Sequence, residues 1–217
     1  MKLAIFDIDN TLIAGDSDLL WGEFLCEHNY VDSNIYASAH EAYYHDYLNG
    51  QLDINNFLEF QLRILKDNNM KVLEKWRKDF FREKIKPIIL PKAFTLINSH
   101  RDLGHELLII TATNRFLVEP IANEFGIKNL IACEPELNNG EFTGKLFGTP
   151  SYAEGKVTRL NEWLKNSHYK TEESWFYSDS HNDIPLLEVV NNPVAVNPDN
   201  FLRKKAKEMN WPVINLR

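Results

Sequence analysis

Short apolar runs alternate along the chain with amphipathic stretches long enough to form helices. The apolar runs cover residues 3–8, 107–110, 130–133, 175–177 and 193–196. Runs of this kind are typical of parallel strands whose two faces are both buried. The stretches that predict helices are 91–103, 115–125, 151–166 and 183–191. This alternation predicts an α/β protein with a Rossmann-like, doubly wound parallel sheet.

The alternation is interrupted between residues 14 and 90, where no strand-like run occurs. Apolar residues there recur at helical spacing in two groups: Ile54, Leu58, Leu62 and Leu65, then Leu73, Trp76 and Phe80. Spacings of three and four place each group on one face of a helix. We therefore predict a helical domain over 14–90, inserted into a core made of 1–13 and 91–217. Its aromatic residues are interpreted mainly as packing within that domain.

Two local patterns add detail at the edges of the fold. Asn139-Gly140 is a strong signal for a type I′ hairpin turn, so we expect a small excursion from the sheet edge over Glu134–Leu146. The cluster Arg203-Lys204-Lys205 is interpreted as the solvated face of a helix.

The charge balance narrows the classes of partner. The chain has 24 Lys and Arg against 31 Asp and Glu, which gives a net charge of -7. Proteins that follow a nucleic-acid backbone or bind an anionic membrane carry an excess of basic residues instead. We therefore expect neither nucleic acid nor membrane as a partner.

The cysteines and the apolar content bear on the compartment. The two cysteines, Cys26 and Cys133, lie far apart and outside any Cys/His cluster, which argues against a disulfide framework and a zinc site. The apolar run at the N-terminus is too short for a secretion signal, and no run approaches the length of a membrane span. A cytoplasmic location is the resulting expectation.

Two carboxylates follow the first predicted strand. Asp7 and Asp9 are two positions apart, so they point to the same side of an extended chain. In open parallel sheets, ligands bind beyond the carboxyl ends of the strands, which is where this pair falls. Carboxylates so close together repel one another unless a cation such as Mg2+ neutralises them.

A second acidic group, Asp179 and Asp183, follows the predicted strand at 175–177. If the strands before Asp7 and Asp179 are neighbours, one Mg2+ could bind both side chains and a substrate phosphate. A single Asp-x-Asp also occurs in metal-dependent glycosyltransferases and by chance in loops. Two acidic strand ends far apart in the sequence are the stronger signal.

Two further features indicate a phosphate ligand. Thr111-Ala112-Thr113-Asn114 follows an apolar run and precedes a predicted helix, where hydroxyls and free backbone N–H groups favour anions. Simple helix capping by Thr113 or Asn114 is the alternative interpretation. Lys156, near the start of another predicted helix, could supply positive charge, although a lone lysine is more often solvated.

Taken in order, these segments resemble the four motifs of the haloacid-dehalogenase-like superfamily of phosphohydrolases. The motifs are DIDNT after the first strand, TATN after the second, Lys156, and SDSHND after a later strand. The resemblance covers essentially the whole chain. The insert at 14–90 is similar to the cap domain of the subgroup that contains phosphoserine phosphatase.

The resemblance implies a role for each acidic motif residue. Asp7 would be the nucleophile that forms an aspartyl-phosphate, and Asp9 would protonate the leaving alkoxide and then accept a proton from water. Asp7, the backbone carbonyl of Asp9 and Asp179 would hold Mg2+, with Asp183 as a further carboxylate of the metal site that orients the metal shell. Dehalogenases of the same fold lack the second aspartate and the metal, so hydrolysis of a small-molecule phosphate monoester is expected.

The resemblance also implies a phosphate-binding set. Its members are Thr111, Ala112, Lys156 and Asn182. These groups would stabilise the negative charge that a phosphoryl-transfer transition state spreads over its oxygens. Lys156 follows Gly155 here, whereas many relatives place the lysine first.

The substrate is less well defined by the motifs. Asp16 falls where phosphoserine phosphatases carry a substrate-binding glutamate, but Gln61 falls where they carry a carboxylate-binding arginine. A neutral amide cannot replace the paired charged contacts of an arginine, which disfavours phosphoserine. Candidate residues for substrate selection are Asp16, Asp18, Trp21 and Arg63, because a cap would close over the phosphate.

Several alternatives stay open at this point. Phosphoserine phosphatase proper remains one, and a phosphotransferase on the same scaffold would pass the phosphoryl group to an alcohol. A metal- or phosphoprotein-binding module without catalysis is disfavoured, because binding alone needs no acid and base at Asp9. The cap could also bind a protein partner. The oligomeric state is not defined by the sequence.

Overall fold

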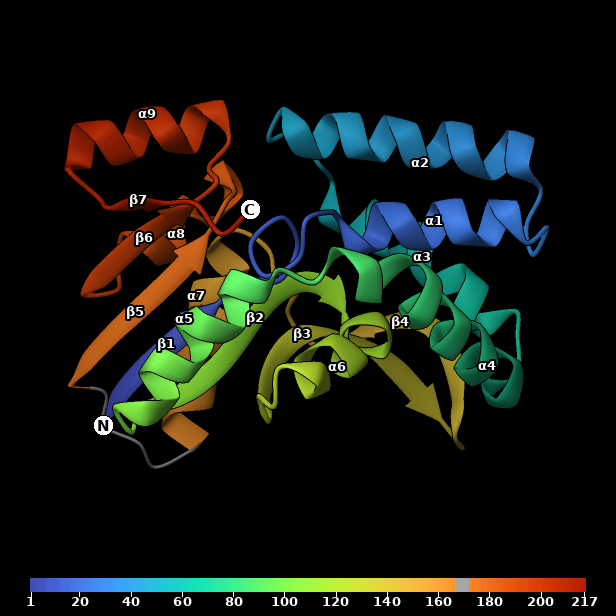
Figure 1. Ribbon diagram of the computed structural model, residues 1–217. Helices are drawn as coiled ribbons and strands as arrows, with labels where there is room; N and C mark the ends of the chain where they lie inside the picture. The colour runs from blue at the N-terminus through green and yellow to red at the C-terminus, as the bar shows by residue number, and fades with distance from the viewer. Residues whose placement is uncertain (167–171) are drawn as a thin grey trace.

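The computed structural model describes residues 1–166 and 172–217, which form one sheet between layers of helices (Figure 1). In the described chain the sheet has the strand order β4-β3-β2-β1-β5-β6-β7. Neighbouring strands are parallel except β3 and β4, which are antiparallel. The strands are β1 (Lys2–Phe6), β2 (Glu106–Asn114), β3 (Asn129–Asn138), β4 (Glu141–Phe147), β5 (Glu173–Ser178), β6 (Asn192–Val196) and β7 (Val213–Ile214). The predicted α/β class with a mainly parallel sheet is confirmed.

Helices cover both faces of this sheet. They are α5 (Pro91–Asp102), α6 (Arg115–Glu124), α7 (Glu154–Asn166), α8 (Ile184–Leu187) and α9 (Asn200–Met209). Ala4 and Phe6 of β1 pack in the hydrophobic cluster with α5 and α6, whereas Leu3 and Ile5 pack with α7, α8 and α9. All four side chains are fully buried. The strand is apolar throughout because neither of its faces reaches solvent.

Four α-helices occupy the segment between β1 and α5. They are α1 (Ser17–Glu27), α2 (Ser33–Leu48), α3 (Ile54–Lys66) and α4 (Met70–Phe80), followed by the short turns η1 (Phe81–Ile85) and η2 (Lys86–Ile88). Leu58, Leu62 and Leu65 lie on the buried face of α3, as their spacing predicts. One hydrophobic cluster runs from this segment into the sheet. The division into a core of 1–13 and 91–217 and a cap of 14–90 therefore stays a prediction.

The hairpin between β3 and β4 forms where Asn-Gly predicts it. Asn139 and Gly140 both have positive φ, at 53° and 83°, which is the conformation of a type I′ turn. Asn138 and Glu141 pair on either side of the turn. The hairpin packs against α3 and so reaches the cap segment.

The predicted helix at 183–191 is shorter than expected, and an unpredicted strand follows it. After the turn η3 (His181–Asp183), α8 ends at Leu187. Asn191 then accepts hydrogen bonds from the backbone N–H and hydroxyl of Ser174, which holds the chain against β5 instead of in a helix. Strand β7 has two residues, too few for a pattern to predict. The basic cluster at 203–205 lies on α9 with Arg203 and Lys204 exposed, as expected.

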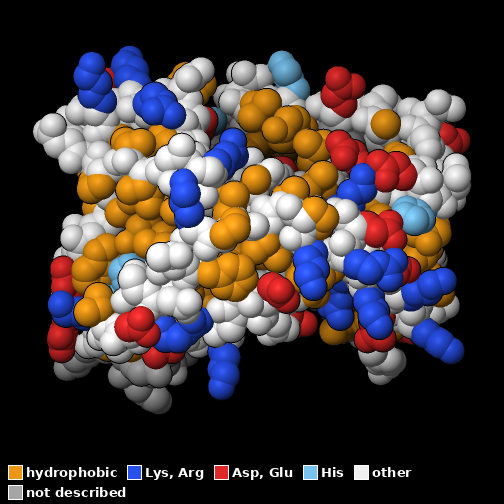
Figure 2. Space-filling view, viewed as in Figure 1, with side chains coloured by type: hydrophobic (Ala, Val, Ile, Leu, Met, Phe, Trp, Pro, Cys, Tyr) orange, Lys and Arg blue, Asp and Glu red, His pale blue; other side chains and the backbone are white. Residues whose placement is uncertain are grey.

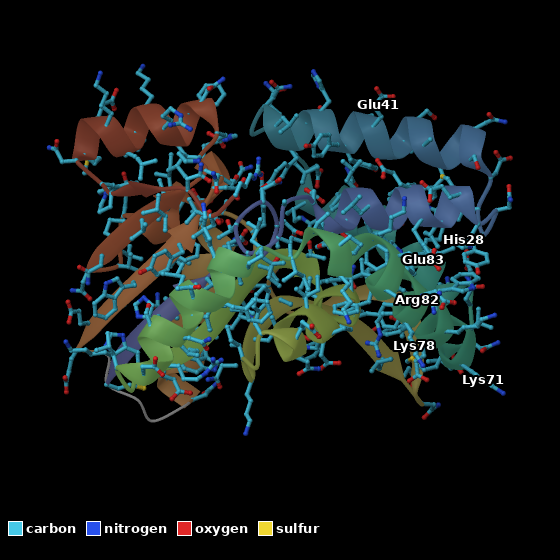
Figure 3. The ribbon with its side chains drawn as sticks, viewed as in Figure 1. His28, Glu41, Lys71, Lys78, Arg82 and Glu83 are labelled. Atoms are coloured by element: carbon cyan, nitrogen blue, oxygen red, sulfur yellow. The ribbon has the colours of Figure 1, made fainter. Side chains whose placement is uncertain are left out.

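Charge is divided unevenly within the cap segment. No Lys or Arg occurs between residues 14 and 62, whereas nine occur between residues 63 and 86. Figure 2 shows basic side chains gathered over α4, and Figure 3 shows Lys71, Lys78 and Arg82 there. The Glu83 carboxylate lies 2.8 Å from Arg82 and 2.9 Å from His28, and it links η1 to the end of α1. Helices α1 and α2 therefore contribute acidic charge without any Lys or Arg.

None of the helices within residues 1–166 and 172–217 is long and apolar enough to cross a membrane.

A buried polar chain lies beneath the sheet, on the side covered by α5. The His100 Nε2 atom is 2.8 Å from the Tyr177 hydroxyl, and its Nδ1 atom is 2.8 Å from His105 Nδ1. His100 is 5% exposed. Burial, with the neighbouring His105 charge, lowers the pKa of His100 to about 4. The folded protein therefore holds this imidazole neutral at pH values where a solvated imidazole binds a proton.

Replacing His100 should reduce the loss of stability at acid pH. Between the usual histidine pKa of 6.5 and about 4, the unfolded chain binds a proton that folded His100 resists, so the free energy of unfolding falls as the pH drops. Between pH 7 and pH 4.5, we expect the free energy of unfolding to fall by roughly 1–3 kcal/mol less in His100→Gln than in the wild type, as measured by urea unfolding. His45→Gln, at an exposed histidine, is the control. If the free energy of unfolding falls equally in the wild type and in His100→Gln, buried His100 is not the cause of the decrease.

Candidate active site

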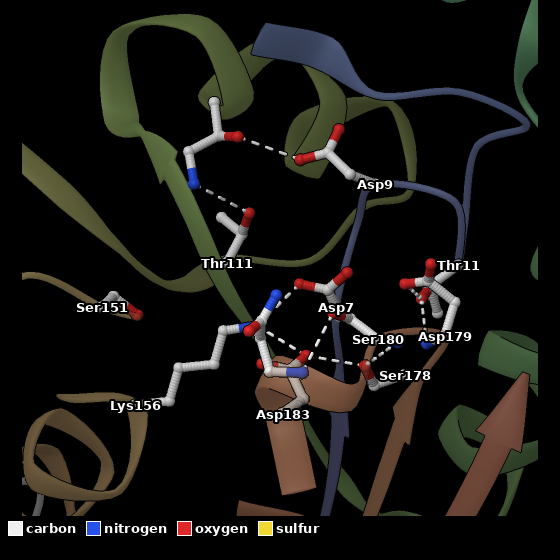
Figure 4. A network of polar contacts seen from close by, with 12 residues as sticks. Asp7, Asp9, Thr11, Thr111, Ser151, Lys156, Ser178, Asp179, Ser180 and Asp183 are labelled. Carbon is white, nitrogen blue, oxygen red and sulfur yellow. Dashed lines mark hydrogen bonds and ion pairs between the residues drawn. The ribbon is translucent and has the colours of Figure 1, made fainter. Parts of the chain in front are cut away.

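The ends of β1 and β5 bring the first and last acidic motifs together (Figure 4). Phe6 and Tyr177 are paired across these two neighbouring strands, so Asp7 and Asp179 follow side by side. The Thr11 hydroxyl accepts a hydrogen bond from the Asp179 backbone N–H at 3.1 Å, and it donates one to the Asp179 carboxylate at 3.2 Å. This threonine joins the two loops, a role that the sequence analysis did not assign to it.

Lys156 lies between two of the carboxylates. It is 2% exposed, and its ammonium donates to Asp7 at 2.9 Å and to the two oxygens of Asp183 at 2.7 and 2.8 Å. Burial alone would lower the pKa of Lys156, but the carboxylates of Asp183 and Asp7 together raise it above its usual value. Lys156 is therefore charged and fixed, and it is not the solvated lysine of the alternative interpretation.

The structure places Asp183 against Lys156. Among the carboxylates predicted for the metal site, it is the one whose two oxygens both contact Lys156. One of them also accepts a hydrogen bond of 2.6 Å from the Ser178 hydroxyl. A carboxylate engaged in this way has its lone pairs directed at the ammonium and the hydroxyl. Asp183 thus holds Lys156 in place.

Burial raises the pKa of the acidic groups at the strand ends. For Asp7 it raises the pKa to about 7; the attraction of Lys156 offsets burial only in part, and repulsion from Asp183 and Asp9 adds to it. Burial and the Asp16 charge likewise raise the pKa of Asp9 to about 7. The pKa of Asp179 is raised well above its usual range by burial and by Asp7.

The donor set of Asp7, Asp9 and Asp179 fits Mg2+ in its chemistry. Asp7 and Asp179 offer carboxylate oxygens, and Asp9 offers its backbone carbonyl, because both of its carboxylate oxygens accept hydrogen bonds from Ser17 and Thr113. Hard divalent cations prefer such oxygen ligands. Lys156 carries one positive charge and already contacts two carboxylates, those of Asp7 and Asp183, so a divalent cation would supply the balance for the remaining negative charge. As the described side chains stand, no three His, Cys, Asp or Glu groups are close enough to hold a metal ion.

A single hydroxyl lies between Asp9 and Asp18. The Thr113 Oγ1 atom is 2.9 Å from Asp9 and 3.0 Å from Asp18. A hydroxyl carries one proton, so both contacts are hydrogen bonds only if one carboxyl is protonated. Burial raises the pKa of Asp18 well above its usual range, and the charges of Asp16 and Asp9 add to this. We infer that Asp18 is the neutral acid, that it donates to Thr113, and that Thr113 donates to Asp9.

A pocket lies above these groups, between the cap helices and the strand ends. Its lining from the core comprises Asp7, Asp9, Thr111, Ala112, Thr113, Tyr152, Lys156, Asn182 and Asp183, and its lining from the cap segment comprises Asp16, Asp18, Leu19, Tyr43, Tyr44, Tyr47, Leu52, Ile54 and Phe57. The predicted phosphate-binding set is thus brought to one place. The aromatic wall from α2 and α3 was not singled out from the sequence, because its residues also fit a helical core.

Two candidate residues for substrate selection lie elsewhere. Trp21 is 1% exposed and packs with Phe24 and Phe80, because it lies on the side of α1 that faces the hydrophobic cluster. Arg63 is exposed and lines a separate groove between α3 and the β4 hairpin. Gln61 is buried and accepts a hydrogen bond from the Tyr36 hydroxyl. Among the four candidates, Asp16 and Asp18 line the pocket.

Gly155 explains the unusual placement of the lysine. A Cβ atom on Gly155 would lie 2.0 Å from the carbonyl oxygen of Pro150, so the first turn of α7 can approach that loop only with glycine. This close approach sets where α7 begins and therefore where Lys156 enters the site.

Gly155→Ala should destabilise the protein and displace Lys156. A backbone oxygen cannot move aside as a side chain does, so we expect a loss above about 2 kcal/mol in urea unfolding. Gly148→Ala is the control, because nothing lies within 4 Å of its added Cβ and only the cost of a positive φ remains. Equal losses for the two variants would show that the contact with Pro150 is unimportant.

Asp18→Asn should be tolerated where Asp18→Ala is not. Asparagine keeps a neutral group that can donate to Thr113, whereas alanine leaves the buried hydroxyl without this partner. We expect Asp18→Ala to lose about 1–3 kcal/mol in urea unfolding at pH 7 and Asp18→Asn to lose little. An asparagine variant as unstable as the alanine variant would mean that Asp18 is ionised in the folded protein.

Comparisons with known proteins show the family of the chain. Residues 4–188 match the haloacid dehalogenase-like hydrolase family. A histidinol-phosphatase of Neisseria meningitidis serogroup C (strain 8013) is 45% identical over 220 residues, covering 100% of this chain and 99% of the relative. A protein of unknown function from Bordetella pertussis Tohama I has a TM-score of 0.94 at 39% identity, covering 100% of this chain and 99% of that chain.

A structure of phosphoserine phosphatase with an analogue of its phospho-aspartyl intermediate shares the fold. Its TM-score is 0.71 at 18% identity, covering 100% of this chain and 93% of that chain. The match to the family model and the full-length relative together decide the assignment. The chain belongs to the haloacid dehalogenase-like hydrolases and is a phosphatase of that family.

Proposed function

We propose that the protein hydrolyses histidinol phosphate, through an aspartyl-phosphate formed on Asp7. The observation that carries this proposal is the charge of the pocket. Of the described residues that line it, Lys156 is the only cation, and it already lies between Asp7 and Asp183. Asp16 and Asp18 line the cap side of the same pocket.

This charge distribution disfavours a substrate with a carboxylate. Phosphoserine carries an ammonium, a carboxylate and a phosphate, and its carboxylate would enter the pocket beside aspartates with no free cation among the described lining residues. An unpaired charge of that kind is costly to desolvate. Histidinol phosphate keeps the ammonium and the phosphate but has an imidazolylmethyl group in place of the carboxylate.

The cap wall suits the remaining groups of histidinol phosphate. Tyr43, Tyr44 and Phe57 offer aromatic faces on which an imidazole ring can stack. Asp16 supplies a carboxylate for the ammonium. The absence of Lys and Arg from residues 14–62 leaves this whole wall attractive to cations. The 45% identical relative is named for the same activity.

The residues at the floor supply the chemistry in this proposal. Asp7 attacks phosphorus while Lys156, fixed by Asp183, stabilises the charge on the phosphoryl oxygens. The Thr111 hydroxyl, the Ala112 N–H and the Asn182 amide would bind the other oxygens. Asp7, Asp9 and Asp179 would hold Mg2+, which when bound offsets the repulsion between the nucleophile and the phosphate.

Asp9 is suited to move the proton. Its pKa of about 7 allows it to give a proton to the leaving alkoxide and later to take one from water. The hydrogen bonds from the Ser17 N–H at 2.6 Å and from Thr113 at 2.9 Å fix its orientation. The same residue can therefore serve both half-reactions.

The direct test is the release of phosphate from histidinol phosphate and from phosphoserine in the presence of Mg2+. We expect kcat/KM for histidinol phosphate to be higher by about 100-fold, or roughly 3 kcal/mol. Chelation of Mg2+ and Asp7→Asn should each abolish turnover, and Glu141→Gln on the exposed hairpin should not. Faster hydrolysis of phosphoserine would overturn the substrate, and transfer to an added alcohol in place of water would indicate a phosphotransferase.

Asp16→Asn should weaken the binding of a substrate that carries an ammonium group. Asparagine keeps the helix cap that Asp16 provides to the Leu19 N–H but removes the charge for the ammonium. We expect the KM for histidinol phosphate to rise about tenfold, with little change for an aryl phosphate that has no cationic group. An equal effect on both substrates would contradict the contact between Asp16 and the ammonium.

A further inference from the structure

We propose that Tyr47 and Tyr152 are positioning residues that orient the amide of Asn182, so that phosphate binding depends on the seating of the cap on the 178–183 loop. The role of Asn182 rests on the proposed function. The contacts themselves are independent of the substrate's identity.

The Asn182 amide is held at both of its ends. Its oxygen accepts a hydrogen bond of 3.1 Å from the Tyr152 hydroxyl, and its nitrogen donates one of 3.3 Å to the backbone carbonyl of Tyr47. A backbone carbonyl can only accept, so its contact settles which end of the amide is the donor, and the Tyr152 hydroxyl then donates to the other end. The second N–H of the amide remains for a ligand, and Asn182 lines the pocket above Asp7.

Tyr47 makes a second contact with the same loop. Its hydroxyl donates to the Ser180 hydroxyl at 3.2 Å, and the Ser180 hydroxyl accepts from the backbone N–H of Asn182 at 3.2 Å. Tyr47 lies in the last turn of α2, so these contacts join the cap to the loop that carries Asp179 and Asp183. A displacement of α2 would therefore remove one of the two restraints on Asn182.

A glycine permits this close approach. Gly50, just after α2, has φ of 66°, and a Cβ there would lie 3.0 Å from His181 Nε2. His181 cannot easily move aside, because the Asp199 carboxylate contacts both its ring Nδ1 and its backbone N–H at 2.8 Å. A side chain at position 50 would push the cap away from the loop.

An oriented amide binds phosphate more tightly than a free one because less side-chain freedom is lost on binding. The two hydrogen bonds to Asn182 therefore increase the affinity for the phosphoryl group. Neither tyrosine hydroxyl needs to touch the phosphate for this effect. The cap contributes one restraint and the core the other. Seating of the cap and binding of phosphate should favour each other for this reason.

The first test measures the binding of inorganic phosphate to the intact protein with Mg2+ by calorimetry. Tyr152→Phe should weaken binding about fivefold, the effect of one lost hydrogen bond. In the Asn182→Ala background the same change should have no further effect, because no amide remains to be oriented. An equal effect of Tyr152→Phe in both backgrounds would overturn the positioning role.

The second test addresses the cap. Gly50→Ala should weaken phosphate binding about fivefold or more, by unseating the cap. Gly140→Ala is the matched control, since it also adds a Cβ at positive φ but meets nothing within 4 Å. His181→Ala should restore part of the binding lost in Gly50→Ala by removing the obstructing ring. If Gly50→Ala binds phosphate as the control does, the dependence on the cap is wrong.

These measurements separate the two proposals. Phosphate binding requires no turnover, so the outcomes for Tyr152 and Gly50 stand even if the protein proves to hydrolyse another ester. Conversely, hydrolysis of histidinol phosphate together with unchanged phosphate binding in all the variants would retain the function and reject the positioning role.

Discussion

The buried ammonium of Lys156 holds the site together electrostatically. Asp7 and Asp183 both lie within 3 Å of it, and without it two carboxylates would be buried beside each other with no compensating charge. The arrangement depends on the fold at several points. Gly155 lets α7 begin against the Pro150 carbonyl, and the Ser178 hydroxyl donates to one of the Asp183 oxygens that contact Lys156. Asp7 and the ammonium beside it are thus set before any ligand arrives, which is the preorganisation that phosphoryl transfer requires.

The rest of the pocket carries more negative charge than Lys156 can balance. Asp7, Asp9, Asp16 and Asp18 all line it, and burial together with their mutual repulsion raises the pKa of each. A divalent cation at the floor and a cationic group on the substrate are two ways to compensate this charge. The same imbalance that fits Mg2+ therefore also favours a substrate with an ammonium group over one with an added carboxylate.

The cap and the core meet on a loop that serves both. The 178–183 loop carries Asp179, Asn182 and Asp183, and it is bound from the cap side by Tyr47 and approached by Gly50. Such an arrangement links the closing of the pocket to the orientation of groups at its floor. The hydrophobic cluster shared by the cap segment and the sheet supports the same contact from behind.

The sequence alone determined the strand and helix alternation, the cap helices and the acidic ends of β1 and β5, because period and motif order are local properties. It predicted the β3–β4 hairpin for the same reason, since a type I′ turn depends on two adjacent residues. Tertiary structure decided which of the candidate side chains for substrate selection face the pocket. Trp21 and Asp18 are three positions apart on α1, yet Trp21 is packed in the core and Asp18 lines the pocket. The role of Asp183 was likewise decided by Lys156, which lies 27 residues away in the chain. Pairings over such separations depend on how helices pack on the sheet, and no local pattern in the chain records them.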